Sequence, residues 1–135
     1  MKKPIESLAI IPARGGSKSI KKKNIKLFNG KPLISWTIEQ ALASNVSRVI
    51  VTTDNAEIRG IALSYGAEVP FLRDHTLATD ITGIEPVIIN VLDYLENEER
   101  YQPNCVVLLM PTSPFREVDD IDTALKIFNN EKVSS

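Results

Sequence analysis

LAIIPARGGSKSIKKKN, residues 8–24, joins a wholly apolar run to a basic segment that contains two adjacent glycines. The apolar run ends at Pro12, and a short run of this kind is typical of a strand that is buried on both faces. Such strands occur in parallel sheets that helices cover on both sides. We therefore expect residues 8–11 to form a buried strand and the basic segment to leave its end as a loop.

Three further stretches have strand character. Residues 48–53 and 105–110 are continuous runs of apolar and β-branched side chains, which predicts two more buried strands. Residues 68–72 predict a short strand that belongs near an edge of the sheet, because Pro70 cannot donate a backbone hydrogen bond.

Apolar stripes at helical spacing separate these strands. The stripes begin after Pro32, at Asp54, near Pro86 and near Val118. Asp54 has capping-box spacing with Glu57, so it is predicted to cap the second helix. Alternating strands and helices predict right-handed βαβ units, and thus an α/β fold: a three-layer α/β/α sandwich with a mostly parallel, Rossmann-like sheet.

Composition limits the classes of function. A length of 135 residues predicts one domain, residues 1–135. The 16 basic and 17 acidic residues give a net charge of −1, which argues against a nucleic-acid partner. The single cysteine, Cys105, excludes an internal disulfide, and the apolar runs are too short to span a membrane. We expect a cytoplasmic protein with no membrane partner.

The basic segment carries the strongest chemical signal. Ligands of parallel sheets bind at the carboxyl ends of the strands, and this segment leaves one of those ends. Arg14 can bind phosphate oxygens in bidentate fashion, Lys18 adds a mobile charge, and the glycines let backbone N–H groups approach a phosphate. The segment matches neither the P-loop nor the dinucleotide fingerprint. It predicts a polyphosphate site, although Lys21 and Lys22 also fit a solvated basic loop.

Five blocks of the sequence resemble the N-terminal portion of the acylneuraminate cytidylyltransferases, the CMP-sialic acid synthetases. They are, in order, IIPARGGSKSIKKKNI, GKPLISWTIEQAL, VIVTTDNAEI, FLRDHTLATD and LLMPTSPFR. The resemblance implies a fold of the nucleotide-diphospho-sugar transferase type. It also implies an enzyme that transfers CMP from CTP to the anomeric hydroxyl of an acidic nine-carbon sugar, a nonulosonic (sialic-type) acid, and releases pyrophosphate with the help of Mg²⁺.

The resemblance also has consequences for the organisation of the protein. Members of the family usually run well past 200 residues, so we expect this chain to be a truncated cytidylyltransferase that is inactive alone. Most Mg²⁺ ligands are then expected in the missing C-terminal part, and no metal ligand is assigned within residues 1–135. The full-length enzyme is expected to form a homodimer.

Roles for individual residues follow from the same blocks. The residues that match the catalytic cations are Arg14, Lys18 and Lys23. Positive charge there stabilises the negative charge that develops on the leaving pyrophosphate. The residues that match the nucleotide-binding positions are Arg14, Gly15, Gly16, Lys18, Lys23, Asn24, Arg73 and Thr82.

Two departures from the family pattern leave alternatives open. Met110 occupies the position at which members usually place a sugar-contacting Gln, and a thioether cannot donate the hydrogen bonds of a carboxamide. The acceptor could therefore be a modified nonulosonic acid. Ile84 replaces a small hydroxyl residue, which would also fit a non-catalytic or degenerate CTP-binding domain. A 3-deoxy-manno-octulosonate cytidylyltransferase relative is the third possibility.

Overall fold

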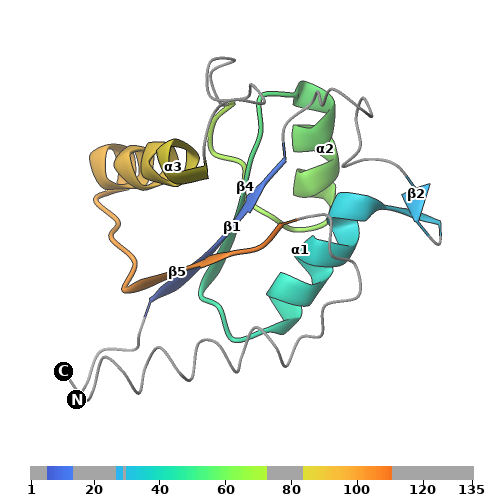
Figure 1. Cartoon of the computed structure of the whole chain (residues 1–135), viewed down its shortest axis with the longest axis horizontal. Helices are drawn as coiled ribbons and strands as arrows, with labels where there is room; N and C mark the ends of the chain where they lie inside the picture. Colours follow the sequence, from blue (N-terminus) through green and yellow to red (C-terminus); the bar gives the residue numbers. More distant parts are fainter. Residues whose placement is uncertain (1–5, 14–26, 29, 73–83, 111–135) are drawn as a thin grey trace.

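The computed structural model describes residues 6–13, 27–28, 30–72 and 84–110. In this part a parallel three-stranded sheet has the order β4-β1-β5, with β1 (Ser7–Pro12) between β4 (Arg48–Thr52) and β5 (Cys105–Leu108) (Figure 1). The three strands predicted at 8–11, 48–53 and 105–110 are thereby confirmed. The helix predicted near Val118 lies outside the described residues.

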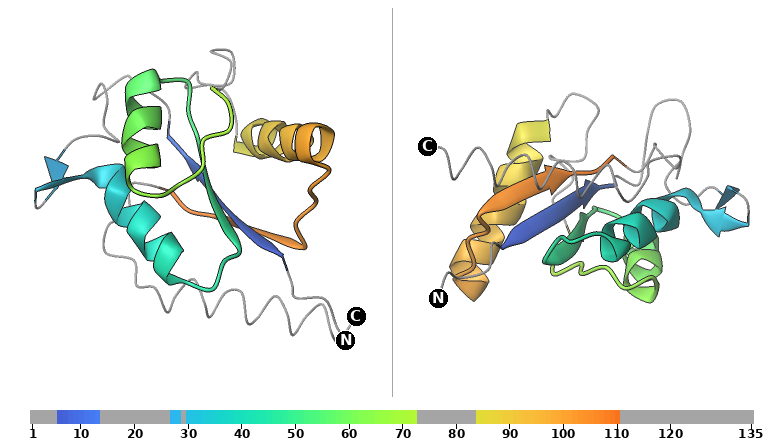
Figure 2. Two further views of the ribbon diagram at one scale, coloured as in Figure 1. Left: turned by 180° about the vertical axis from the view of Figure 1, so that it is seen from behind. Right: turned by 90° about the horizontal axis from the view of Figure 1, so that it is seen from below.

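Helices cover both faces of the sheet. Helices α1 (Leu33–Ala43) and α2 (Ala56–Ser64) pack on one face, and α3 (Ile84–Glu99) packs on the other, as the two views of Figure 2 show. Each described strand–helix–strand connection crosses over to a parallel strand, as expected for βαβ units. The predicted three-layer α/β/α arrangement is confirmed.

Every residue of β1 is buried, because its side chains alternate between two hydrophobic clusters. Ala9 and Ile11 belong to the cluster with α1 and α2, whereas Leu8 and Ile10 belong to the cluster with α3. Residues that alternate in this way must be apolar on both faces of the strand. The apolar run of residues 8–11 therefore reflects the central place of β1.

Strand β5 is less buried than its sequence predicts. Val106 and Val107 are half-buried, and Leu108 is 38% exposed. Among the described strands β5 pairs with β1 alone, so one of its edges has no neighbour in this part of the chain. An apolar sequence predicts that a strand belongs in a core, but not how many neighbours it has.

Two predicted local features were wrong in detail. The side chain of Asn55, not of Asp54, caps α2 by accepting a hydrogen bond from the backbone N–H of Ile58 at 3.0 Å. Residues 68–72 do not form a strand but make two isolated parallel bridges to the β4 segment, Ile50 with Glu68 and Thr53 with Leu72. A proline between the bridges explains the interruption, since it has no N–H to donate.

A short hairpin was not predicted. Strands β2 (Leu27–Phe28) and β3 (Lys31–Pro32) pair antiparallel, and Gly30 adopts a φ of +83° in the turn between them. The sequence signal was present, because Asn-Gly is the preferred dipeptide of tight hairpin turns. Pro32 is the last residue of β3 and immediately precedes α1.

Candidate functional site

The carboxyl ends of the described strands meet at one edge of the sheet, here called the rim: residues 12–13, 52–54, 72 and 109–110. The backbone N–H of Ala13 donates to the carbonyl of Thr52 at 2.9 Å, and that of Leu109 donates to the carbonyl of Ile10 at 3.0 Å. The bridge between Thr53 and Leu72 joins a further segment to the same edge. Parallel α/β sheets bind their ligands at this edge.

Three predicted ligand-binding segments start at the rim. The basic segment follows Ala13, the segment with Arg73 follows Leu72, and the residues PTSPFR follow Met110. Backbone pairing of the β1, β4 and β5 segments thus brings together residues that lie far apart in the sequence.

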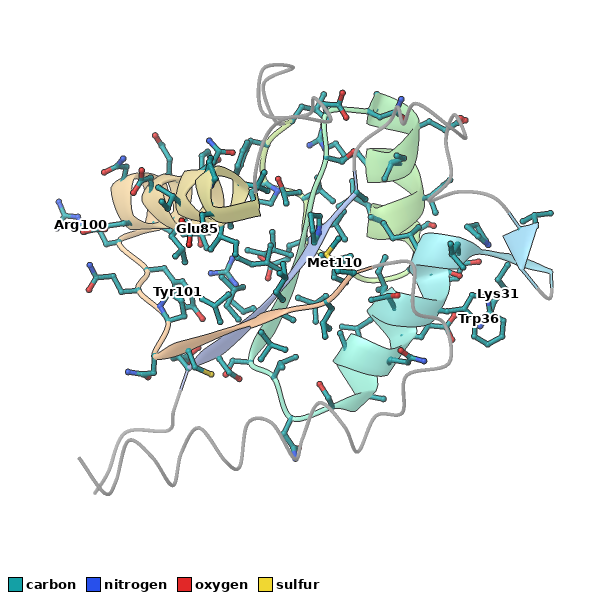
Figure 3. The ribbon with its side chains drawn as sticks, viewed as in Figure 1. Lys31, Trp36, Glu85, Arg100, Tyr101 and Met110 are labelled. Atoms are coloured by element: carbon teal, nitrogen blue, oxygen red, sulfur yellow. The ribbon has the colours of Figure 1, made fainter. Side chains whose placement is uncertain are left out.

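The described chain resumes after the basic segment with the β2–β3 hairpin, which contacts α1. The Lys31 ammonium lies 2.7 Å from a carboxylate oxygen of Glu39 and 4.1 Å from the ring centroid of Trp36 (Figure 3). An ammonium over an aromatic face is attracted by the ring electrons, so this contact holds the hairpin against α1. The described residues that flank the basic segment, Ala13 before it and this hairpin after it, are therefore both held by contacts within the fold.

Most predicted site residues lie outside the described part of the chain. They are Arg14, Gly15, Gly16, Lys18, Lys23, Asn24, Arg73 and Thr82. Met110 is described: it is 43% exposed and lies just beyond the end of β5 (Figure 3).

Two buried threonine hydroxyls that sequence reasoning did not single out lie at the rim. The Thr53 hydroxyl accepts a hydrogen bond from the backbone N–H of Asn55 at 3.2 Å. The Thr52 hydroxyl is buried and makes no hydrogen bond within the described part of the chain. The available signal was the pair of threonines that ends the predicted strand, which had been interpreted only as β-branched core.

The described residues do not supply a complete metal site. No group of three or more His, Cys, Asp or Glu side chains within residues 6–13, 27–28, 30–72 and 84–110 could hold a metal ion. The described helices also include none that is long and apolar enough to cross a membrane.

The main cluster of charged and aromatic contacts lies at the opposite, amino end of the sheet. Arg48 makes a bidentate pair with Glu68, at 2.6 and 2.9 Å, and a second pair with Glu99 at 3.1 Å. Its guanidinium carbon lies 4.5 Å from the ring centroid of Tyr101, whose hydroxyl donates to Glu6 at 3.0 Å. These contacts join distant segments and are remote from the rim.

Two pKa values reflect this cluster. The hydrogen bonds of Arg48 to Glu68 raise the pKa of its guanidinium above the ordinary value. Burial, followed by the hydrogen bond to Glu6, raises the pKa of Tyr101 to about 12. A shallow polar cavity of about 420 Å³ lies nearby, lined by Glu96, Asn97, Arg100 and Gln102. It does not coincide with the rim, and we assign it no part in ligand binding.

The fold and the rim define an α/β protein whose parallel strands end at one common edge, the place where sheets of this kind bind ligands. Residues 8–135 match the family model described as "Cytidylyltransferase". The chain therefore belongs to the cytidylyltransferase family, and the resemblance seen in its sequence blocks is confirmed.

Curated relatives agree with this membership. The CMP-N,N'-diacetyllegionaminic acid synthase of Legionella pneumophila is 43% identical over 121 residues, which are 89% of this chain and 52% of the relative. The pseudaminic acid cytidylyltransferase of Campylobacter jejuni is 41% identical over 125 residues, 92% of this chain and 53% of the relative. This chain thus spans about half the length of these two relatives.

A vertebrate relative and solved structures extend the comparison. N-acylneuraminate cytidylyltransferase A of Danio rerio is 55% identical over 128 residues, 94% of this chain and 28% of the relative. A solved CMP:2-keto-3-deoxy-manno-octonic acid synthetase complexed with CTP has a TM-score of 0.79 at 21% identity, covering 94% of this chain and 48% of that one. The structural likeness supports the fold.

Proposed function

We propose that the protein is a cytidylyltransferase that transfers CMP from CTP to the anomeric hydroxyl of a nonulosonic acid. The anomeric oxygen bonds to the α-phosphorus while the bond from that phosphorus to pyrophosphate breaks. The main support for this proposal is the family match over residues 8–135. Two relatives add to it, because their names specify CMP-N,N'-diacetyllegionaminic acid synthesis and pseudaminic acid cytidylyl transfer.

The convergence of segments at the rim supports the assignment of individual roles. We assign Arg14, Lys18 and Lys23 to the charge that develops on the leaving pyrophosphate. Gly15, Gly16 and Asn24 belong to the same nucleotide-binding segment, which starts one residue beyond the Ala13–Thr52 hydrogen bond.

The second set of roles concerns the base and the sugar. Arg73 directly follows the bridge at Leu72, which supports its assignment, with Thr82, to the cytidine part of the nucleotide. Met110, exposed at the end of β5, is assigned to the acceptor sugar. An apolar contact there fits a nonulosonic acid whose substituent near this position is a methyl or acyl group rather than a free hydroxyl.

Further proposals concern cofactor, assembly and location. We propose Mg²⁺ as the divalent ion, which would neutralise phosphate charge on CTP. A homodimer for the complete enzyme and a cytoplasmic location follow from the family resemblance and from dependence on CTP.

Nucleotide binding provides the first test. We expect isothermal titration of the 135-residue chain to show binding of CTP that is at least tenfold tighter than that of UTP or ATP. Binding should weaken as salt increases, because cationic side chains contact phosphates. Equal affinity for the three nucleotides, or no binding of CTP, contradicts the proposal.

Transfer provides the second test. Pyrophosphate release from CTP and Mg²⁺ is measured with a panel of 2-keto acid sugars, using the enzyme encoded by the whole reading frame beside this chain. We expect release with a nonulosonic acid and a loss of about 100-fold or more when Arg14→Ala removes the phosphate-binding guanidinium. CTP binding without release by any form supports the non-catalytic alternative. Preference for 3-deoxy-manno-octulosonate supports the other alternative.

A further inference from the structure

Thr52 has a feature that its place in the hydrophobic core does not explain. The residue is 1% exposed, and its hydroxyl has no hydrogen-bond partner among the residues that the structure describes. An isosteric valine would fill the same space without a buried polar group, so the fold itself gains nothing from the hydroxyl. A buried hydroxyl without a partner is rare enough in native proteins to call for an explanation.

The position of Thr52 links it to the proposed nucleotide site. Its carbonyl accepts the hydrogen bond from Ala13, the residue before the basic segment. Its neighbour Thr53 is bridged to Leu72, the residue before Arg73. Thr52 therefore lies where the two segments that we assign to the nucleotide both leave the sheet.

The face on which Thr52 lies is set by strand alternation. Val49 and Val51 belong to the cluster under α1 and α2, whereas Ile50 belongs to the cluster under α3. Thr52 follows at the next alternate position, so its side chain shares the α3 face with Ile50. The described cluster on this face is apolar, with Leu8, Ile10 and Leu95 among its buried members.

We infer that the Thr52 hydroxyl is a hydrogen-bonding contact for the nucleoside part of the bound nucleotide. This inference rests on the proposed function. A hydroxyl can donate to a base or ribose oxygen and can also accept from an amino or hydroxyl group. The cationic side chains that we assign to the phosphates lie in the basic segment, whereas Thr52 offers a neutral hydroxyl, which suits the base or the ribose. Because Thr52 is 1% exposed in this structure, the proposed contact requires a rearrangement around its hydroxyl when the nucleotide binds.

The test compares two threonines whose hydroxyls are both buried and make no hydrogen bond in the described part of the chain. Thr37, on α1, also has a buried hydroxyl without a partner, but it lies in the other helix layer. Thr52→Val, Thr52→Ser and Thr37→Val are compared with the wild-type chain by titration with CTP, CMP and inorganic pyrophosphate, and by thermal unfolding. Thr37→Val is the matched control because it removes the same group from a comparably buried place.

We expect Thr52→Val to weaken CTP and CMP binding by about tenfold, which corresponds to the loss of one hydrogen bond. Thr52→Ser should stay within about twofold of wild type, and Thr37→Val should bind normally. Neither valine variant should lower the melting temperature, because each removes an unsatisfied polar group.

Three results would overturn the inference. The first is normal CMP affinity in Thr52→Val, and the second is an equal loss of affinity in Thr37→Val. The third is a loss for pyrophosphate as large as that for CMP, which would place the hydroxyl at the phosphates. Failure of the wild-type chain to bind CTP would instead overturn the proposed function, and the inference with it.

Discussion

At the scale of single residues, Tyr101 shows how burial and a neighbouring charge act together. Its hydroxyl donates to Glu6, and its ring lies under the guanidinium of Arg48. Removing the phenolic proton would leave a partly buried negative charge beside the carboxylate of Glu6. Burial and Glu6 therefore raise the pKa of Tyr101 to about 12 from the ordinary value of 10.0.

This shift predicts a loss of stability at alkaline pH. Between pH 10 and about 12 the unfolded chain releases the Tyr101 proton while the folded chain retains it. The folded state then binds more protons, so the free energy of unfolding falls as pH rises through this window and is unaffected below it. Urea unfolding at pH 8, 10 and 11.5 should show a shallower decline for Tyr101→Phe than for wild type.

The partner of the tyrosine supplies the control. Glu6→Gln removes the carboxylate charge but leaves the ring in place, so its decline should lie between those of wild type and Tyr101→Phe. Identical alkaline slopes in all three proteins would show that other groups cause the loss.

At the scale of elements, two glycines in and just after α2 differ in whether their backbone conformation requires glycine. Gly66 follows the helix with a φ of +100°, and a Cβ added there would lie 3.1 Å from Cδ1 of Leu42. Gly60 lies inside the helix, and an added Cβ would meet nothing within 4 Å. Of these two positions, only position 66 has a positive φ that favours glycine over other residues.

Substitution by alanine should therefore change stability in opposite directions. Gly66→Ala is expected to lower the free energy of unfolding by about 1 kcal/mol or more, because alanine is strained at positive φ. Gly60→Ala should raise it by up to about 1 kcal/mol through helix propensity. Chemical denaturation measures both changes.

A second variant separates backbone strain from crowding. Leu42 is 48% exposed, so its side chain can move away from a new methyl group. Gly66→Ala should thus remain destabilising when Leu42→Ala is also present. Full recovery in the double variant would mean that crowding, and not φ, sets the requirement for glycine.

At the scale of the whole molecule, Arg48 joins segments that are distant in sequence. It pairs with Glu68 after α2 and with Glu99 at the end of α3, and it stacks on Tyr101. The two carboxylates are 45% and 39% exposed, so each ion pair contributes at the modest scale of surface pairs. We expect the two ion pairs and the stacking on Tyr101 together to contribute about 2 kcal/mol to the free energy of unfolding.

Arg48→Met keeps the side-chain stem and removes the charge. We expect the free energy of unfolding to fall by about 2 kcal/mol, and by less in 1 M salt, since screening already weakens the wild-type pairs. Lys31→Met is the control: Lys31 makes the same kinds of contact, with Glu39 and Trp36, but within one local unit. A larger effect at Lys31 than at Arg48 would contradict the importance of long-range contacts.

Local pattern predicted most elements but not their details. The apolar runs and helical stripes located β1, β4, β5 and three helices, because burial on two faces and burial on one face leave different periodicities. The cap of α2 was misassigned to Asp54, since Asp and Asn are equally good caps and adjacent positions differ only in geometry. Residues 68–72 form two bridges rather than a strand, because Pro70 between them has no backbone N–H to donate to a neighbouring strand.

The sequence by itself determined the alternation of strands and helices, the basic and glycine-containing segment, and the blocks that identify the family. Only the tertiary structure decided the order β4-β1-β5, the meeting of Ala13, Thr53 and Leu72 at one rim, and the unpartnered hydroxyl of Thr52. The physical reason is that periodicity reports how a segment is buried, which is a local property. Which strands become neighbours, and which polar group is left without a partner, depends on contacts between residues far apart along the chain.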